Sequence, residues 1–295
     1  MSPEPATEVP TNVCLQLDVV DRAEADEVSG RLWAAGATAI QEIDLGGSRV
    51  RLVAGLDADR VAVAERHLAG RWQPVVFSAH HDGWLDAWRP FARPVLSGGI
   101  LVQPAWQPVE KDLVSRARLI VRVDAGRAFG QGNHATTRLA LEALEQTVVA
   151  GDEVLDVGCG SGILSVAAAM LGAARVVAVD IDDEAARATT QNAGLNGVEQ
   201  RVTASTTPVE FLDGRYDVVV ANILAAVLVD LAPGIAARVK PEGTVLLDGI
   251  RSQQRTEVLA AYEQAGLHPV RESERDGWTA MVMRCGPGME TSRDR

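Results

Sequence analysis

The sequence predicts an α/β protein in which a small α+β domain precedes a larger domain built on a mostly parallel sheet. Two observations carry this prediction. From Thr136 onward, strand-like and helix-like apolar segments alternate, a pattern typical of a parallel sheet covered on both faces. The first 79 residues instead give the order strand, helix, strand, strand, helix, strand, which is the ferredoxin-like arrangement.

The front domain consists of six expected elements. Alternating apolar residues indicate its strands, and apolar residues at helical spacing indicate helices that end at Gly36 and Gly70. Gly46-Gly47 separates the two middle strands, as in a hairpin. The expected elements are strands over 13–19, 39–43, 50–53 and 72–77 and helices over 23–35 and 59–68. Since this part has no glycine-rich loop or catalytic cluster, we expect it to recognise or position a partner.

The larger domain alternates strands with helices and ends in a hairpin. The expected elements are strands over 154–157, 176–180, 216–220, 244–247, 269–272 and 278–283 and helices over 139–144, 164–171 and 184–195. Only a short polar turn separates the last two strands, so one of them must run antiparallel to the rest. In such sheets ligands bind beyond the carboxyl ends of the strands, near the point where strand order reverses.

Domain boundaries follow from shifts in composition. We place the front domain at 12–79, a linker region at 80–99 and the larger domain at 100–285, with disordered tails at 1–11 and 286–295. The linker region is rich in Trp, His and Pro. Trp84 and Trp88 are four residues apart and share one face of a short helix, so we expect them to pack between the domains.

Composition narrows the class of protein. The chain has 295 residues, of which 47% are hydrophobic and 23% charged, as in ordinary globular proteins. No apolar run reaches the roughly 18 residues of a membrane-spanning helix, and the N-terminus lacks the order of a signal peptide. The three scattered cysteines argue against disulfides and against a metal site, and fit the cytoplasm. The net charge of −12 disfavours nucleic acid and favours a basic protein partner.

A glycine-rich turn, Gly158-Cys159-Gly160-Ser161-Gly162, lies between the first strand of the larger domain and its helix. Glycines let the backbone approach a ligand closely, and the N–H groups that open the helix can meet a carboxylate. NAD enzymes use a similar turn, but Ile163 stands where their fingerprint has a third glycine or alanine. The turn therefore predicts a cofactor site, and the spacing disfavours a dinucleotide.

Polar residues end two other strands of this sheet. Asp180 ends the second strand, so its carboxylate should lie beside the glycine-rich turn and accept hydrogen bonds from ribose hydroxyls. The alternative role is a helix cap, for which Asp182 is the stronger candidate. Asn222, at the end of the fourth strand, can accept from an amine and donate to a carboxylate. Its alternative role is that of a turn asparagine.

A second glycine-rich loop, from Phe129 to Thr137, leads into the helix expected over 139–144. Thr136 or Thr137 could cap that helix. The functional alternative is a lid or floor over the cofactor, with Thr137 hydrogen-bonded to it. His134 could act directly at the site, although a lone histidine is more often structural.

These motifs together resemble a known family. DVGCGSGIL at 156–164, VDID at 179–182 and ANILA at 221–225 resemble class I methyltransferases of the PrmA type, which modify ribosomal protein L11. The similarity also covers GWLDAW at 83–88, the loop at 129–137, and Gly249-Ile250 with Gln253. It implies a Rossmann-like domain whose mostly parallel seven-stranded sheet ends in an antiparallel hairpin, preceded by a ferredoxin-like substrate-recognition domain.

The resemblance also implies an activity and a set of site residues. It implies that S-adenosylmethionine is the methyl donor and that the lysine ε-amino and N-terminal α-amino groups of L11 are trimethylated by a monomeric, cytoplasmic enzyme. The cofactor-binding residues would be Thr137, Gly158, Gly160, Asp180, Asn222, Phe129 and Gly130. One departure concerns the loop, which reads FGQGNHATT here and FGTGTHPTT in the family. Cofactor binding should survive, but losing the proline loosens the backbone and puts substrate choice in question.

Methyl transfer from a sulfonium is an in-line displacement that depends on positioning. The attacking amine must be neutral, although the pKa of free lysine is about 10.4. No side chain stands out as a base, so we expect Asn222 to orient the amine while water takes the proton. The alternatives are a methyltransferase of the same fold acting on another protein lysine, an NAD-dependent oxidoreductase, and a binding module without activity. An amide or nucleobase target is disfavoured, because such enzymes carry Asn-Pro-Pro-Tyr where this chain has Asn-Ile-Leu-Ala.

Overall fold

The computed structural model describes residues 12–37, 39–78, 93–108, 111–124 and 132–286. The chain separates into two compact units, Met1–Ala92 and Arg93–Arg295. The tail expected at 1–11, residues 287–295 of the other tail, and both Trp84 and Trp88 lie outside the described residues. Within the described ranges, no helix is both long enough and apolar enough to cross a membrane.

The first unit has a four-stranded antiparallel sheet with the strand order β2-β3-β1-β4. Its elements are β1 (Asn12–Val19), α1 (Arg22–Ala34), β2 (Ala39–Asp44), β3 (Val50–Asp57), the 3₁₀ turn η1 (Ala58–Arg60), α2 (Val61–Leu68) and β4 (Val75–Ser78). This order confirms the ferredoxin-like arrangement. The expectation that the last strand begins at Trp72 is wrong. Trp72 precedes β4 and packs into the core, where its indole N–H donates to the Glu24 carboxylate at 2.9 Å.

One face of the first sheet is covered by the two helices of this unit. Along β3, buried residues such as Leu52 and Leu56 alternate with partly exposed ones. The buried side chains pack with Val28 and Leu32 of α1 and with Leu68 of α2. The alternation that predicted the strands therefore also fixes which face of the sheet is apolar.

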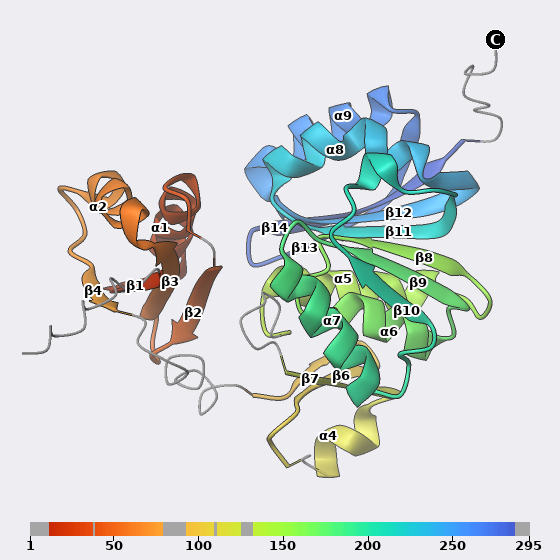
Figure 1. Ribbon diagram of the computed structural model, residues 1–295, viewed down its shortest axis with the longest axis horizontal. Coiled ribbons are helices and arrows are strands. Elements are labelled where there is room, and N and C mark those ends of the chain that lie inside the picture. Colours follow the sequence, from red (N-terminus) through yellow and green to blue (C-terminus); the bar gives the residue numbers. More distant parts are fainter. Residues whose placement is uncertain (1–11, 38, 79–92, 109–110, 125–131, 287–295) are drawn as a thin grey trace, which may run out of the picture. The chain divides into compact units, whose positions relative to one another are not determined.

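The second unit is built on a seven-stranded sheet with the order β10-β9-β8-β11-β12-β14-β13 (Figure 1). Its strands are β8 (Glu153–Val157), β9 (Arg175–Val179), β10 (Val202–Ser205), β11 (Tyr216–Asn222), β12 (Val239–Arg251), β13 (Leu267–Arg275) and β14 (Trp278–Cys285). The strands from β8 to β12 run parallel, and β14 lies antiparallel between β12 and β13. The predicted mostly parallel sheet with a terminal hairpin is thus confirmed.

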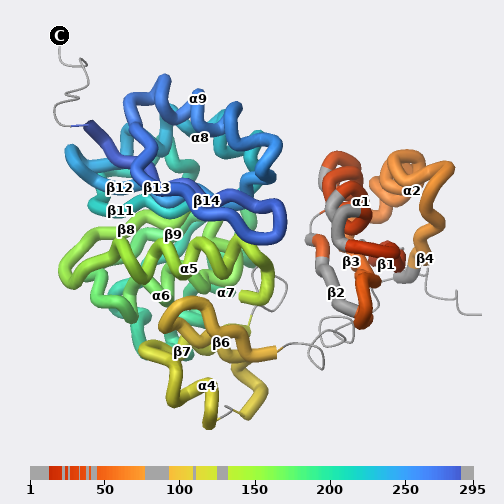
Figure 2. The backbone as a smooth tube through the Cα atoms, turned by 180° about the vertical axis from the view of Figure 1, so that it is seen from behind, coloured from red at the N-terminus to blue at the C-terminus, as the bar shows by residue number. Residues whose placement is uncertain are grey.

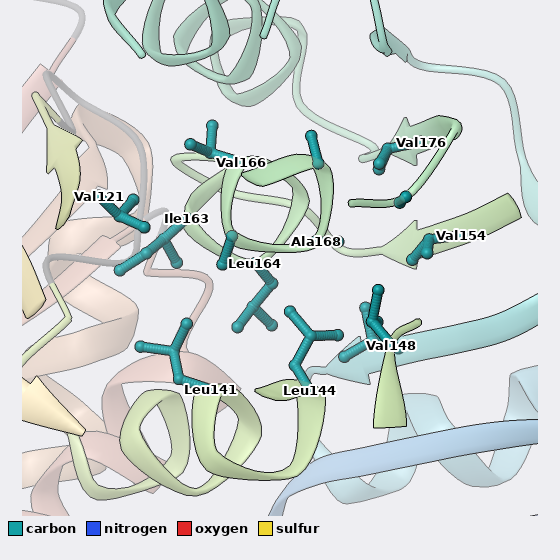
Figure 3. Packing of buried hydrophobic residues seen from close by; sticks show 14 of the residues in the cluster. Val121, Leu141, Leu144, Val148, Val154, Ile163, Leu164, Val166, Ala168 and Val176 are labelled. Carbon is teal, nitrogen blue, oxygen red and sulfur yellow. The ribbon is translucent and has the colours of Figure 1, made fainter. Parts of the chain in front are cut away.

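Helices cover both faces of this sheet, and Figure 2 shows the same two layers from behind. The helices are α5 (Ala135–Thr147), α6 (Ile163–Leu171) and α7 (Asp183–Leu195) on one face, and α8 (Ala225–Ala237) and α9 (Arg255–Gln264) on the other, with η3 (Val209–Phe211) and η4 (Ser252–Gln254) as short 3₁₀ turns. Leu141 and Leu144 of α5 meet Leu164 of α6 in the first layer (Figure 3). Alternate residues of each central strand face opposite layers; in β11, Val220 packs toward α5 and α6, and Val219 toward α8 and α9.

A small sheet with the order β5-β6-β7 precedes α5 in the chain. Its elements are β5 (Val95–Ser97), β6 (Ile100–Pro104), α4 (Lys111–Arg116) and β7 (Leu119–Val123). Asn192 of α7 and Asn196, which caps the end of α7, pair with the backbone at Arg122 of β7 and at Asp124 just after it. The Asn196 side chain accepts the N–H of Arg122 at 2.8 Å and donates to its carbonyl at 2.7 Å. Asn192 does the same with Asp124, at 2.9 Å for both bonds.

Candidate active site

The glycine-rich turn connects the carboxyl end of β8 to α6. Gly158, Gly160 and Gly162 all have positive φ, at 77°, 52° and 77°, a conformation that side chains with a Cβ rarely adopt. Gly162 is the N-cap of α6, and its N–H donates to the carbonyl of Cys159 at 2.8 Å. A Cβ on Gly162 would lie 2.7 Å from Thr189 of α7, so this turn is closely packed from behind. The turn therefore presents backbone at the carboxyl edge of the sheet.

Asp180 follows β9 directly and is hydrogen-bonded to this turn. Its Oδ2 accepts the N–H of Gly160 at 2.9 Å, and its Oδ1 accepts the N–H of Asp182 at 3.1 Å. Asp180 thus lies beside the glycine-rich turn, as its place in the sequence predicted. Each carboxylate oxygen has two lone pairs, so both can still accept a ligand hydroxyl. Asp182 has a different role, because its side chain caps α7 by accepting the N–H of Glu184 at 2.9 Å.

Ile223 joins three parts of this edge. A Cβ on Gly158 would lie 2.1 Å from the Cγ2 of Ile223, and a Cβ on Gly249 would lie 2.1 Å from the carbonyl oxygen of Ile223. The ends of β8 and β12 therefore close on the residue that follows β11. Asn222, the last residue of β11, is half-buried, and its side chain makes no hydrogen bond within the described residues. No described residue occupies the Asn222 amide, so it can accept and donate to a ligand there.

Two buried acids lie near the same edge. Asp156 of β8 is fully buried, and its Oδ2 accepts the hydroxyl proton of Ser165 at 2.6 Å. Burial raises the pKa of Asp156 to about 7, and the negative charge of Asp180 contributes to the rise. Asp248 of β12 is also buried, and burial raises the pKa of its carboxyl well above the usual value.

The first turn of α5 borders the site. Thr136 and Thr137 are both buried in this turn. The expectation that one of them caps α5 is wrong, as is the expected start at Leu139. The N-cap is His134, whose Nδ1 accepts the N–H of Thr136 at 3.3 Å, so the helix begins at Ala135. The His134 ring also meets Trp278 edge-on, with 5.0 Å between ring centroids.

The second glycine-rich loop reaches α5 through Gly132. Phe129, Gly130 and Gln131 lie outside the described residues. Gly132 is described, with φ at 88°, and a Cβ there would lie 2.5 Å from Val102 of β6. The position just before α5 therefore requires glycine, because the backbone packs closely against Val102 there.

The edge has features that suit an extended, partly polar ligand. The N-terminus of α6 favours a carboxylate, and the Asp180 oxygens can accept from hydroxyls. Directly after Asp180, Ile181 is 99% exposed and offers an apolar surface at the same edge. Within the described ranges no group of three or more His, Cys, Asp or Glu residues could hold a metal ion. The helix N-terminus, the Asp180 oxygens and the exposed Ile181 are the features of this edge that fit an organic cofactor.

Three residues of this edge were not predicted from the sequence. Ile223 was noted only as part of the ANILA motif, although it fills the space between Gly158 and Gly249. Ile181 could have been noticed as an apolar residue between acids, since such a residue cannot sit in the core beside them. Asp248 gave no signal, because it extends an apolar run that reads as an ordinary buried strand.

Comparisons with known proteins agree with this site. The family model described as ribosomal protein L11 methyltransferase (PrmA) matches residues 62–285. The chain is 42% identical over 257 residues to the ribosomal protein L11 methyltransferase of Symbiobacterium thermophilum, covering 86% of this chain and 79% of that one. It is 43% identical over 218 residues to the protein of the same name from Citrifermentans bemidjiense, covering 72% and 70% of the two chains.

A solved structure gives the same result. The crystal structure of ribosomal protein L11 methylase from Lactobacillus delbrueckii subsp. bulgaricus superimposes with a TM-score of 0.59 at 34% sequence identity. The match covers 64% of this chain and 95% of that one. The chain therefore belongs to the ribosomal protein L11 methyltransferase (PrmA) family.

Proposed function

We propose that this chain uses S-adenosylmethionine to methylate ribosomal protein L11, adding three methyl groups at lysine ε-amino groups and at the N-terminal α-amino group. The observation that carries the proposal is the bond between the Asp180 carboxylate and the N–H of Gly160, with Asn222 at the end of the neighbouring strand β11 and without a side-chain partner among the described residues. This combination of acceptor, turn and amide occurs in a chain that belongs to the L11 methyltransferase family. The same geometry without that membership would fit other nucleoside-containing cofactors.

Each of the proposed cofactor residues is expected to contact a different part of the cofactor. Gly158 and Gly160 bring the backbone close to the methionine part, and Asp180 accepts from the ribose hydroxyls. Thr137, from the first turn of α5, and Phe129 with Gly130, from the preceding loop, would complete the enclosure. When bound, this cofactor supplies a methyl group on a positively charged sulfur, which makes the methyl carbon open to attack by an amine.

The target amine needs to be neutral and aligned. Asn222 is placed by the end of β11 and by the packing of Ile223 against two glycines, so its position is fixed on both sides. Its side-chain oxygen can accept one N–H of the amine and turn the nitrogen lone pair toward the methyl carbon. Exclusion of water by the closely packed edge lowers the pKa of the amine, because burial disfavours the ammonium form.

The first unit is proposed to bind the protein substrate. It has the ferredoxin-like arrangement, and the glycine-rich turn, Asp180 and Asn222 all belong to the second unit. We propose boundaries of 12–79 for this recognition domain, 80–99 for the linker region and 100–285 for the catalytic domain. The net charge of −12 would favour encounter with a basic ribosomal protein in the cytoplasm, and we propose that the enzyme acts as a monomer without nucleic acid or membrane.

The test is methylation of purified ribosomal proteins. The chain is incubated with labelled S-adenosylmethionine and total large-subunit proteins lacking this modification, and the labelled residues are located by mass spectrometry. Label on L11 lysines and on its α-amino group is expected, and the Asn222→Ala variant should lose most of the rate and bind S-adenosylhomocysteine more weakly, because Asn222 is also proposed to contact the cofactor. Label on a different protein with L11 unmodified would overturn the substrate, and calorimetric binding of NAD in place of S-adenosylhomocysteine would overturn the reaction class.

A further inference from the structure

The carboxyl end of β12 holds an acidic side chain that the proposed chemistry leaves unused. Asp248 is 1% exposed, and its Oδ1 accepts the N–H of Gly249 at 2.8 Å. Its other oxygen, Oδ2, is buried and has no donor within the described residues. Burying a carboxyl oxygen without a donor is unfavourable. The Oδ2 atom is therefore suited to receive an N–H group from a ligand.

An irregularity in the sheet sets the position of Asp248. The pairing of β12 with β14 is regular as far as Leu247 opposite Met281 and resumes at Ile250 opposite Thr279. Asp248 and Gly249 thus face the single residue Ala280, which is the geometry of a β-bulge. Bulges redirect a side chain and are frequent beside active sites. The φ of Gly249, at 83°, and its close approach to the Ile223 carbonyl fix this bulge against the end of β11.

Asp248 lies beside Asn222. The two residues are register partners on neighbouring parallel strands, which are about 4.8 Å apart. Val220 and Leu246, two residues earlier in each strand, pack in the layer between the sheet and α5. Because side chains alternate along a strand, Asn222 and Asp248 both face that layer as well.

The order of the strands places Asp248 on one particular side of Asn222. Across the sheet in the order β9, β8, β11 and β12, the residues at this level are Asp180 directly after β9, the glycine-rich turn after β8, Asn222 at the end of β11, and Asp248, which pairs with Asn222 inside β12. The proposed cofactor residues Asp180, Gly158 and Gly160 therefore lie on one side of Asn222, and Asp248 lies on the other. In an in-line displacement the amine approaches the methyl carbon from the side opposite the departing sulfur. Asp248 lies on the side of Asn222 away from the proposed cofactor residues, from which the amine would approach.

We propose that Asp248 binds the target ammonium group and takes its proton, a role that rests on the proposed function. One proton moves from the ammonium nitrogen to Oδ2 of the Asp248 carboxylate and leaves a neutral amine and a carboxylic acid. The nitrogen lone pair then forms the bond to the methyl carbon, and the carbon–sulfur bond of the sulfonium donor breaks with its electron pair left on sulfur. The methylated ammonium leaves, and Asp248 loses its proton to water. This replaces the direct transfer to water expected from the sequence.

The surroundings of Asp248 suit a proton acceptor. Burial raises the pKa of its carboxyl, which the Gly249 hydrogen bond only partly offsets, and no charged side chain of the described residues contributes. The elements packed against β12 on the side that Asp248 faces, or beside it in the sheet, carry the titratable residues His134, Arg138, Glu142 and Glu145 at α5, Tyr216 and Asp217 on β11, and Arg284 and Cys285 on β14. In the opposite layer they are Asp230 of α8 and Arg255, Glu257, Tyr262 and Glu263 of α9. A carboxyl with a pKa closer to the working pH is a stronger base than an exposed carboxylate.

The test compares Asp248→Asn with the wild-type chain in L11 methylation between pH 6 and pH 9.5. The amide has the same shape as the acid but cannot take a proton. At pH 7, kcat/KM should fall by about 100-fold or more, while the affinity for S-adenosylhomocysteine, measured by calorimetry, stays within about twofold. The residual rate of Asp248→Asn should rise about tenfold per pH unit as the free amine forms, whereas the wild-type rate should level off. Asp217→Asn, at the opposite end of the neighbouring strand, is the matched control.

Several outcomes overturn the inference without touching the proposed function. An Asp248→Asn variant within about threefold of wild type at every pH would show that the carboxyl takes no proton. An equal loss of S-adenosylhomocysteine affinity would assign Asp248 to the cofactor or to the fold. If Asp248→Asn does not fold, Asp248→Glu serves instead, since it keeps the carboxyl and should keep the wild-type pH profile at a lower rate. Absence of L11 methylation by the wild-type chain would instead overturn the proposed function.

Discussion

The ends of β8 and β12 use the same two residue types to different effect. In each, a buried aspartate precedes a glycine of positive φ, as Asp156 precedes Gly158 and Asp248 precedes Gly249. Both glycines approach Ile223, but Gly158 meets its side chain and Gly249 meets its backbone carbonyl. Asp156 accepts the side-chain hydroxyl of Ser165, whereas Asp248 accepts only the backbone N–H of Gly249, and each carboxyl keeps one buried oxygen without a partner in the described residues. Asp156 is thus held by a side chain from α6, and Asp248 by its own backbone bulge.

The largest effect is expected for Gly249→Ala. The new Cβ would lie 2.1 Å from a carbonyl oxygen that cannot rotate away, and the residue must also hold φ at 83°. Strain and overpacking together should lower the free energy of unfolding by about 4 kcal/mol, measured by calorimetry. Gly277→Ala is the matched control, because Gly277 has φ at 76° with nothing within 4 Å of its Cβ position. Equal losses in both variants would mean that the contact with Ile223 is unimportant.

Gly158→Ala should cost less, about 3 kcal/mol, since its Cβ would meet the Cγ2 of a side chain. A second change separates the two glycines. Ile223→Ala removes that Cγ2 atom, so it should restore about half of the stability lost in Gly158→Ala and none of that lost in Gly249→Ala. A double-mutant cycle by calorimetry measures both couplings. Rescue of both variants, or of neither, would contradict the distinction drawn between the two glycines.

A third prediction concerns Asp156, the acid that accepts from a side-chain hydroxyl. Because the pKa of Asp156 is raised to about 7 in the folded chain, the folded state holds a proton that the unfolded state loses near pH 4. Stability should therefore fall as the pH rises, by about 2 kcal/mol between pH 5.5 and pH 7.5. Asp156→Asn should abolish this part of the fall. The test is urea unfolding of both chains across that range, and parallel curves for the two would count against it.

The smallest effect is expected at Asp180. Asp180→Asn keeps one acceptor oxygen but loses the charge and one of the two acceptors that hold Gly160 and Asp182. Affinity for S-adenosylhomocysteine should drop by about tenfold, equivalent to about 1.4 kcal/mol. Asp182→Asn, which keeps the cap of α7, should change this affinity little. Calorimetric titration of both variants decides whether the two aspartates differ as their hydrogen bonds indicate.

Local signals in the sequence were sufficient for most of the fold and for one side of the site. Apolar periodicity predicted the main strands, and the spacing from the glycine-rich turn to Asp180 predicted that the two meet, as the 2.9 Å bond shows. Thr136 and Thr137 were considered as helix caps because hydroxyl side chains are common at that position. The N-cap is His134 instead, and its ring nitrogen accepts the N–H of Thr136. The strand β10 was not predicted, because its four residues are too few and too polar to give a clear apolar pattern.

Features that depend on distant pairing could not be read in advance. The bulge at Asp248 and Gly249 exists only because β14 pairs with β12 out of step over those two residues. A glycine within a strand, here Gly249, favours a bulge, but only the pairing with β14 shows where the two strands fall out of step. The same holds for Ile223, since its two glycine neighbours, Gly158 and Gly249, come from opposite directions in the chain. Residues positioned by strand partners therefore need the structure, whereas those positioned by their own turn do not.

The asparagine pairing beside β7 has a consequence for association between molecules. An uncovered edge strand presents a row of backbone N–H and C=O groups that can recruit a strand from another chain and begin aggregation. Asn192 and Asn196 occupy those groups with side-chain amides that have the donor and acceptor of a peptide unit but cannot extend into a further strand. The two asparagine side chains thus take the hydrogen-bonding positions that a neighbouring strand would use. A strand from another molecule therefore cannot pair with the backbone at Arg122 and Asp124, although these backbone groups remain hydrogen-bonded.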